Sequence, residues 1–353
     1  MQGIHGGDIY TNNIKLDFSV NLNPLGVPVG VETALHEAVA YCQAYPDIQA
    51  HELKEKMAEQ FGVSKECFLF GNGASELFMG IMHALKPRKV LLPVPSFYGY
   101  EYVAKAVESE IEYFYLSREN SFLPGASLLK MLTEEIDLLF LANPNNPTGK
   151  LLERGYLKRL LEICKENGIH VVVDECFISF CEGAVSLFSE IEKYQNLLLV
   201  QAFTKSYAIP GVRLGYLMSS NHTLVQSIAK QLPEWNLSVF AQKAGIACVE
   251  ETAYLAETVA YVQREREYLT DGLKKLGVHV FSGAGNFILF YTEMSLYEQL
   301  LKRGILIRDC RNFRGLSEGY YRIAVKKREE NEILLREIGE CFAENRIVIA
   351  GEN

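Results

Sequence analysis

The fold is decided by the stretch LLLVQAFTKSYAIPGVRLGYLM, residues 197–218. Its apolar ends, 197–200 and 212–218, predict two strands. Lys205 follows the first strand, and Arg213 lies eight positions later. A lysine amine is a nucleophile only when it is neutral, and an apolar approach with a second positive charge nearby favours loss of its proton. The spacing therefore indicates a lysine that condenses with an aldehyde cofactor, although a lone lysine at a strand end is usually a surface residue.

Short apolar runs recur along the chain and alternate with amphipathic stretches such as 153–167. This alternation predicts an α/β fold, in which a mainly parallel sheet is wrapped by helices. The strand-like runs lie at 90–92, 138–141, 170–173 and 197–200, and one long helical pattern covers 241–276. We expect an extended, Gly-, Asn- and Pro-rich arm over 1–28, a large domain over 29–245 and a smaller α+β domain over 246–353.

Composition is that of a folded globular protein and excludes several classes of function. Of the 353 residues, 48% are hydrophobic and 22% are charged. A formal net charge of -9 argues against a nucleic-acid binder, and no apolar run approaches the roughly 18 residues that span a bilayer. The eight cysteines form no CxxC pair and no secretory leader opens the chain, so we expect a cytoplasmic protein. Cys176 and Cys181 could be a metal or redox pair, but packing is commoner for free cysteines, and we expect no metal.

Three polar clusters follow directly after apolar runs, at the strand ends where doubly wound sheets hold their ligands. FGNGASE, residues 70–76, leads into a helical pattern over 77–85 through glycines that let backbone N–H groups approach an anion. NPNNPTG, residues 143–149, either aims an asparagine into the cleft or is only a turn. Asp174 emerges from a buried run and needs either a cation, such as a protonated pyridine nitrogen, or backbone donors. Together the clusters predict one ligand site at this edge of the sheet.

These strings resemble the fold-type I pyridoxal 5′-phosphate enzymes of the aminotransferase class I/II group, over nearly the whole chain. Within that group, histidinol-phosphate aminotransferases and the threonine-phosphate decarboxylases of cobalamin synthesis share the asparagine loop, the Asp-Glu-x-aromatic string and the Thr-Lys…Gly-x-Arg string. Finer features are more similar to the decarboxylases: HGGD (5–8), LDFSVNLNPLG (16–26), YAIPG (207–211), ILIRDC (305–310), YYR (320–322), and Phe177 in place of the aminotransferases' typical tyrosine. Asp8 and Ser206 depart from the usual pattern, which has asparagine and often an aromatic residue there.

The resemblance implies a pyridoxal 5′-phosphate cofactor and assigns a role to each matching residue. Lys205 would be the Schiff-base lysine, Asp174 the partner of the pyridinium nitrogen, and Asn146 the partner of the phenolic oxygen. Phe97 would stack on the ring, although an aromatic residue there is more often core filling. The cofactor phosphate would be bound by Gly73, Ala74, Ser75, Thr204, Arg213 and, from a second subunit, Tyr45. Because the resemblance places Tyr45 of one subunit at the phosphate of the other, it implies a homodimer with shared active sites.

The resemblance also implies a phosphorylated amino acid as substrate, bound by His5, Asn23, Arg308 and Arg322. Two arginines suit a molecule with both carboxylate and phosphate, although either alone could be a surface salt bridge. The expected reaction is decarboxylation of O-phospho-L-threonine to (R)-1-amino-2-propanol O-2-phosphate. The alternative is an aminotransferase that uses 2-oxoglutarate and acts on histidinol phosphate or a related amino acid. A non-catalytic protein of this fold is disfavoured, because the set of lysine, aspartate and arginines is complete.

Overall fold

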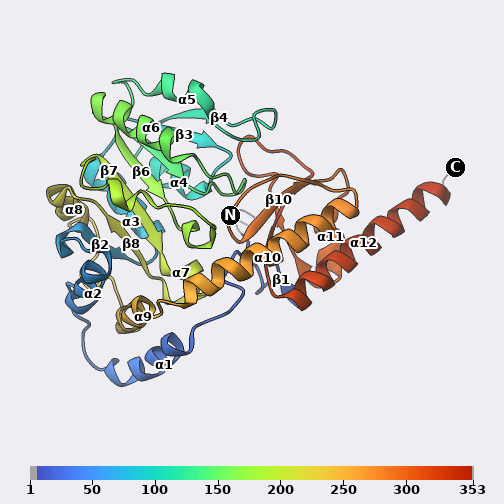
Figure 1. Ribbon diagram of the computed structural model, residues 1–353, viewed down its shortest axis with the longest axis horizontal. Helices are drawn as coiled ribbons and strands as arrows, with labels where there is room; N and C mark the ends of the chain where they lie inside the picture. Colours follow the sequence, from blue (N-terminus) through green and yellow to red (C-terminus); the bar gives the residue numbers. More distant parts are fainter. Residues whose placement is uncertain (1–5, 352–353) are drawn as a thin grey trace.

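The computed structural model describes residues 6–351, with side chains as far as residue 344, and has two domains (Figure 1). The larger domain contains a seven-stranded sheet. In spatial order its strands are β2 (Phe68–Gly71), β8 (Gly215–Met218), β7 (Leu197–Ala202), β6 (His170–Asp174), β5 (Leu138–Ala142), β3 (Lys89–Val94) and β4 (Glu110–Tyr115). Within this sheet β8 is antiparallel to both its neighbours, and the other strands run parallel to one another. The mainly parallel sheet expected from the apolar runs is confirmed.

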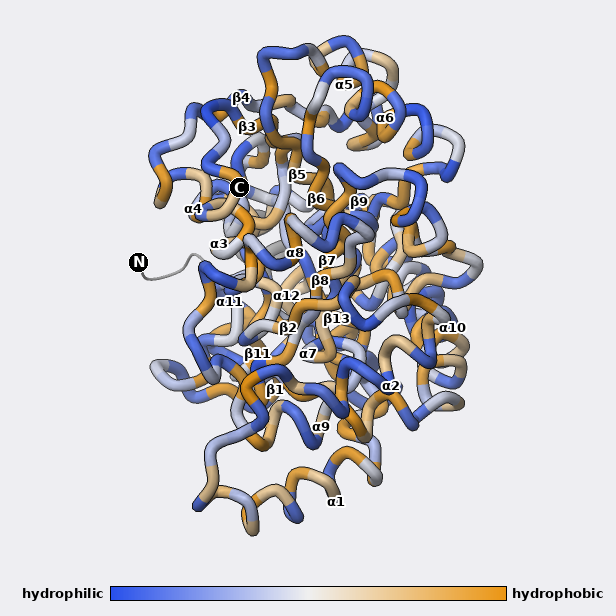
Figure 2. Tube along the Cα trace, turned by 90° about the vertical axis from the view of Figure 1, so that its left-hand side faces the viewer, coloured by the Kyte–Doolittle hydropathy of each residue, from blue (hydrophilic) through white to orange (hydrophobic). Residues whose placement is uncertain are grey.

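The central strands are buried on both faces. Successive strand residues point in opposite directions, so Val171 and Val173 of β6 join the apolar core on one face, and Val172 joins the core on the other. All three valines are fully buried. This double burial explains why the strands read as continuous apolar runs rather than as alternating ones. In Figure 2 the same strands are seen as apolar segments in the interior of the molecule.

Helices cover both faces of the large sheet. One face packs against α1 (Val29–Ala38), α2 (His51–Phe61), α5 (Gly125–Met131), α6 (Arg154–Glu166) and α9 (Val239–Glu250). The opposite face packs against α3 (Ala74–Leu85), α4 (Tyr98–Ala106) and α8 (His222–Ala229). The amphipathic pattern at 153–167 is therefore confirmed as a helix, and the glycine string at 70–76 does join a strand to a helix.

Two expected elements differ in extent. Strand β8 begins at Gly215 instead of residue 212, because Pro210–Val212 forms a 3₁₀ turn and Arg213 is left-handed with φ 61°. The helical pattern over 241–276 is two helices, since Glu251 leaves the helical conformation between α9 and α10 (Tyr254–Lys275). Cys248 of α9 lies in the large-domain core, so this core includes residues beyond position 245.

The smaller domain has a four-stranded antiparallel sheet in the order β12 (Arg308–Asp309), β13 (Tyr320–Ala324), β10 (Phe287–Tyr291) and β9 (His279–Val280). Its helices are α10, which runs across from the large domain in Figure 1, α11 (Leu296–Lys302) and α12 (Arg328–Gly351). The N-terminal arm is not wholly irregular, because β1 (Leu16–Asp17) pairs in parallel with β11 (Ile305–Leu306). That pairing fixes the arm to the small domain.

Candidate active site

The strand ends of the large domain meet the small domain and the N-terminal arm around a cavity of about 230 Å³. The sheet supplies the loops after β2, β3, β5, β6 and β7, and the turn before β8. Most of the predicted site residues line this cavity: Gly73, Ala74, Ser75, Phe97, Asn146, Asp174, Thr204, Lys205, Arg213, Arg308 and Arg322. The predicted strand-end site is therefore formed by one continuous set of side chains.

Lys205 lies on α7 (Phe203–Ser206), a single helical turn that follows β7 directly. Burial lowers the pKa of its amine from 10.5 to about 8. The guanidinium groups of Arg322 and Arg213 contribute to this lowering, while the Cys176 side chain opposes it. Arg213, the positive neighbour expected from the sequence, thus lowers the pKa of Lys205 together with Arg322 of the small domain. The result is a lysine whose neutral, nucleophilic form is accessible near neutral pH.

The depressed pKa of Lys205 predicts how the protein combines with an aldehyde cofactor. The protonated amine cannot attack a carbonyl carbon, so below pH 8 the association rate should fall about tenfold per pH unit. Above pH 8 it should level off, whereas an ordinary lysine would continue to gain reactivity towards pH 10.5. The measurement is the rise of visible absorption after cofactor-free protein is mixed with pyridoxal 5′-phosphate at a series of pH values. A rate that still climbs steeply at pH 10 would contradict this environment for Lys205.

Asp174 ends β6 and is held by two donors. The Tyr100 hydroxyl donates to its Oδ2 at 2.6 Å, and the Cys176 backbone N–H donates to its Oδ1 at 2.9 Å. Burial raises the pKa of the carboxyl, and these hydrogen bonds oppose that rise. A buried carboxylate of this kind is stabilised by a cation, which the protonated ring nitrogen of the expected cofactor would supply. Tyr100 was not anticipated from the sequence, where it is one of several aromatic residues on a helix.

The loop between β2 and α3 has the features of an anion cradle. Gly73 has φ 75°, and a Cβ atom there would lie 2.8 Å from Arg213 Nη2. Only glycine allows the guanidinium this close to the loop. No side chain caps α3, so the N–H groups of its first turn, which include those of Ala74 and Ser75, point toward the cavity end of the helix. With buried Thr204 beside them, these groups fit the phosphate of the expected cofactor.

The two predicted substrate arginines lie opposite each other on neighbouring strands. Arg308 of β12 pairs in register with Arg322 of β13, so both side chains leave the same face of the sheet and reach the cavity. Arg322 donates to Asn146 Oδ1 and, at 2.8 Å, to the Ser19 carbonyl oxygen. Within the part of the chain that the structure describes, its buried Nε has no hydrogen-bond partner. Burial lowers the pKa of both guanidinium groups, that of Arg322 to about 10.

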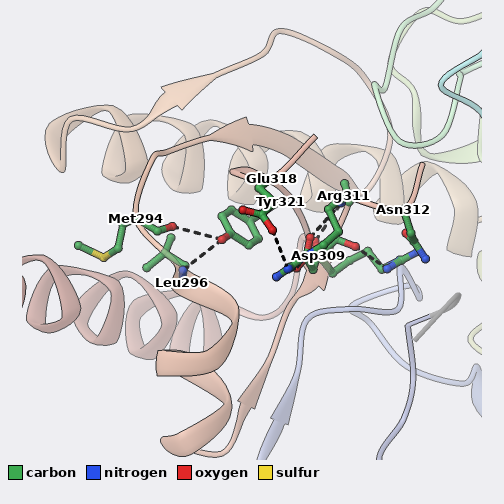
Figure 3. A network of polar contacts seen from close by, with 9 residues as sticks. Met294, Leu296, Asp309, Arg311, Asn312, Glu318 and Tyr321 are labelled. Atoms are coloured by element: carbon green, nitrogen blue, oxygen red, sulfur yellow. Dashed lines mark hydrogen bonds and ion pairs between the residues drawn. The ribbon is translucent and has the colours of Figure 1, made fainter. Parts of the chain in front are cut away.

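A polar network behind these strands fixes the positions of the arginines (Figure 3). Asp309 accepts from Arg311, which also reaches Glu318 at 3.1 Å. The Tyr321 hydroxyl accepts from the Leu296 backbone N–H and donates to the Met294 carbonyl oxygen, each at 3.2 Å. Arg308 itself donates to Asn312 Oδ1 at 2.7 Å. Both arginine-bearing strands are therefore tied to neighbouring segments of the small domain.

Two of the predicted residues that the structure describes, Asn23 and Tyr45, do not line the cavity. Asn23 is buried outside it, where its amide donates to the Ser206 carbonyl oxygen at 2.7 Å and to Thr258 Oγ1 at 2.8 Å. Its position supports the arm against α7 rather than a direct contact with substrate. Tyr45 is 83% exposed, and His5 lies outside the described residues. Asp8, the departure from the usual asparagine, turns to Thr11 and is not among the lining residues.

Asn21 lines the cavity although the sequence did not single it out. It is 2% exposed, and its Oδ1 atom has no hydrogen-bond partner among the described residues. A buried amide oxygen without a hydrogen-bond donor destabilises the fold, which indicates that a bound group donates a hydrogen bond to this atom. Asn21 and Asn23 lie in the same string, LDFSVNLNPLG, and only the path of the arm shows which of them faces the cavity.

The two candidate metal or redox cysteines have different surroundings. Cys181 is buried, while Cys176 lines the cavity beside Asp174. Burial raises the pKa of both thiols. In the described part of the chain, no group of three or more His, Cys, Asp or Glu side chains could hold a metal ion.

Comparison with known proteins identifies relatives that match along nearly the whole chain. The profile of the family described as aminotransferase class I and II matches residues 13–338. Threonine-phosphate decarboxylase from Salmonella typhimurium is 33% identical over 343 residues, 94% of each chain. The solved histidinol-phosphate aminotransferase from Clostridium acetobutylicum superimposes with a TM-score of 0.88 at 31% identity, covering 93% of this chain and 99% of that one. L-Threonine-O-3-phosphate decarboxylase from Porphyromonas gingivalis has a TM-score of 0.82 at 27% identity, with 93% and 99% covered.

Proposed function

Because this chain belongs to the aminotransferase class I and II family of pyridoxal 5′-phosphate enzymes, we propose that it decarboxylates O-phospho-L-threonine to (R)-1-amino-2-propanol O-2-phosphate. The pair Arg308 and Arg322 carries this proposal. Both are buried cations on adjacent strands that face one cavity, an arrangement suited to a short molecule with two anionic groups.

The residues around the cavity match the needs of this reaction. When bound, the cofactor withdraws electrons from the substrate Cα through its protonated ring. Asp174 would keep a proton on the ring nitrogen, and Lys205 would return a proton to Cα after carbon dioxide leaves. Arg308 and Arg322, with Asn21, would hold the substrate's anionic and polar groups and so decide which Cα bond is presented for cleavage. Phe177 lines the cavity without a hydroxyl, which agrees with the pattern of the decarboxylases.

An adjoining hollow favours the second candidate, transamination of histidinol phosphate. This hollow has a volume of about 430 Å³ and shares Phe97, Tyr98, Arg308 and Phe313 with the first cavity. It would offer room for an imidazole ring, which phosphothreonine lacks. The two reactions can therefore be separated by their substrates and by the need for a second, keto-acid substrate.

The decisive experiment supplies the holoenzyme with O-phospho-L-threonine and no keto acid. The proposal expects carbon dioxide and the amine product in equal amounts over many turnovers. If neither appears, and histidinol phosphate is converted only when 2-oxoglutarate is present, the chain is an aminotransferase. O-Phospho-L-serine should be tested beside phosphothreonine, because one methyl group changes discrimination by only about 1 to 3 kcal/mol.

Arg308→Ala is expected to raise the KM for O-phospho-L-threonine by about ten- to a hundredfold, with a smaller effect on kcat. Charge-assisted hydrogen bonds contribute roughly 1.5 to 3 kcal/mol each, and most of this binding is present before the chemical step. Steady-state kinetics with the pure variant measures the effect. Arg336→Ala, an exposed arginine on α12, is the matched control and should leave KM unchanged. A loss confined to kcat would show that Arg308 does not anchor the ground-state substrate.

We infer that the active assembly is a homodimer in the cytoplasm. Large apolar side chains are exposed on and after α1, namely Val29, Val39, Tyr41, Tyr45 and Ile48, and Trp235 lies against Tyr45 with ring centroids 5.1 Å apart. Exposed apolar side chains that are concentrated in one segment of the chain are typical of an interface between subunits. Among the described helices, none is both long and apolar enough to cross a membrane.

A further inference from the structure

Asn236 lies outside the cavity, in the segment between α8 and α9, yet it is bonded to the loop that would hold the cofactor phosphate. Its side-chain amide donates to Glu76 Oε2 at 2.8 Å and to the Phe70 carbonyl oxygen at 3.2 Å. Its own carbonyl oxygen accepts from Asn72 Nδ2 at 2.6 Å. One residue therefore contacts the end of β2, the loop and the first turn of α3.

Asn72 and Glu76 complete a closed circuit around that loop. Glu76 Oε2 accepts from the Asn72 backbone N–H at 2.7 Å, and Glu76 Oε1 accepts from Asn72 Nδ2 at 3.2 Å. On the other side, Arg213 Nη2 donates to the Asn72 carbonyl oxygen at 3.3 Å. Asn72 is thus held from both sides, immediately before Gly73.

We propose that Asn236 is a positioning residue that sets the affinity for the cofactor phosphate by holding Asn72 and Glu76 in place. It does not line the cavity itself. Its action is through the backbone of Gly73, Ala74 and Ser75, whose N–H groups must keep a fixed geometry to bind an anion. This role depends on the family's cofactor and not on which substrate the enzyme uses.

The charge on Glu76 explains why this circuit is needed. A carboxylate in the first turn of α3 lies close to the site of a phosphate dianion, and the two charges repel each other. Here both Glu76 oxygens accept hydrogen bonds, from Asn72 and Asn236. Without the Asn236 amide, Glu76 would lose a donor, and both its side chain and the Asn72 peptide would gain freedom beside the anion. Each of these changes weakens phosphate binding.

The circuit also reaches the molecular surface. Trp235, the residue before Asn236, has φ 53° and is 44% exposed. Its ring contacts Tyr45, which belongs to the exposed apolar surface described above. A left-handed conformation is unusual for a bulky residue. The exposed apolar surface and the loop between β2 and α3 are therefore connected through the consecutive residues Trp235 and Asn236.

The test compares two aldehydes that differ only in the phosphate. Wild-type holoenzyme and Asn236→Ala holoenzyme are freed of cofactor and titrated with pyridoxal 5′-phosphate and with pyridoxal, while visible absorption reports binding. Asn236→Ala should raise the Kd for pyridoxal 5′-phosphate by about ten- to a hundredfold, the range for one bond to a charged group. The Kd for pyridoxal, which has no phosphate, should change by less than about threefold.

Two further variants make the result decisive. Asn72→Ala removes the other side-chain amide of the circuit and should show the same phosphate-selective loss of affinity. It replaces Asn236→Ala as the test variant if Asn236→Ala does not fold. Asn167→Ala is the matched control, because its amide also donates to two carbonyl oxygens, those of Leu132 and Ile163, but far from the loop. The control should leave the ratio of the two Kd values at the wild-type level. Equal weakening of both ligands in Asn236→Ala, or no weakening of either, overturns the proposal.

Discussion

Lys205→Ala is expected to lower kcat for O-phospho-L-threonine by at least about 10²- to 10⁴-fold, the range for losing a positioned proton-transfer group. The actual loss should exceed this range, because under this proposal the same amine would also hold the cofactor covalently. The variant should fold, since the interaction that fixes this residue in α7 is made by its backbone. The Lys205 carbonyl oxygen accepts from the Asn23 backbone N–H at 3.1 Å, and alanine retains that bond. Removing a buried amine that burial already disfavours in its charged form adds no new strain.

Two measurements separate loss of chemistry from loss of structure. Carbon dioxide release under multiple-turnover conditions gives kcat, and intact-protein mass after borohydride treatment shows whether cofactor is attached. Wild-type protein should gain the mass of the reduced cofactor, and Lys205→Ala should gain none. Lys165→Ala, which removes a lysine from the outer side of α6, should behave as wild type in both assays. If Lys205→Ala kept covalent cofactor, another lysine would have to be the attachment site.

The site could be anticipated from the sequence because parallel strands impose a simple rule. Their carboxyl ends meet at one edge of the sheet, so polar strings after apolar runs must converge. Asp174 ends β6, Lys205 follows the neighbouring strand β7, and Gly73 follows β2. No long-range information was required beyond the order of the strands. The resemblance to a known family then supplied the cofactor.

Other parts of the site depend on contacts that leave no local pattern. Arg308 and Arg322 are 14 positions apart in sequence, and only the register of β12 against β13 places them opposite each other. The choice of Asn21 over Asn23 depends on how the arm passes between α7 and the small domain. Tyr100 and Asn236 act through side chains that are 74 and 160 positions away, Asp174 and Glu76. Such contacts are set by tertiary packing, and the local residue pattern does not predict them; Arg308 and Arg322 were expected only through the resemblance to a known family.

Asp174→Asn is expected to lower kcat by between about a hundredfold and a few thousandfold while the protein still folds. Breaking a buried ion pair costs roughly 3 to 5 kcal/mol, and here the pair exists only when a protonated ring nitrogen faces the carboxylate. Asparagine matches aspartate in shape, its amide oxygen can still accept from the Cys176 N–H, and its NH2 group can donate to the Tyr100 hydroxyl oxygen, so the fold is retained. What it lacks is the negative charge that would keep the ring nitrogen protonated and hence electron-withdrawing.

That explanation can be tested with a cofactor whose ring nitrogen is permanently charged. Asp174→Asn reconstituted with N-methylated pyridoxal 5′-phosphate should regain part of the lost kcat, because the cation no longer depends on a neighbouring carboxylate. The wild-type enzyme should gain nothing from the same analogue, since Asp174 would already stabilise the protonated ring. Tyr100→Phe provides a graded comparison: it removes the 2.6 Å hydrogen bond but leaves the charge, and should cost only about 1.5 to 3 kcal/mol. Equal activity of Asp174→Asn with either cofactor would mean that Asp174 serves the fold and not the charge of the ring.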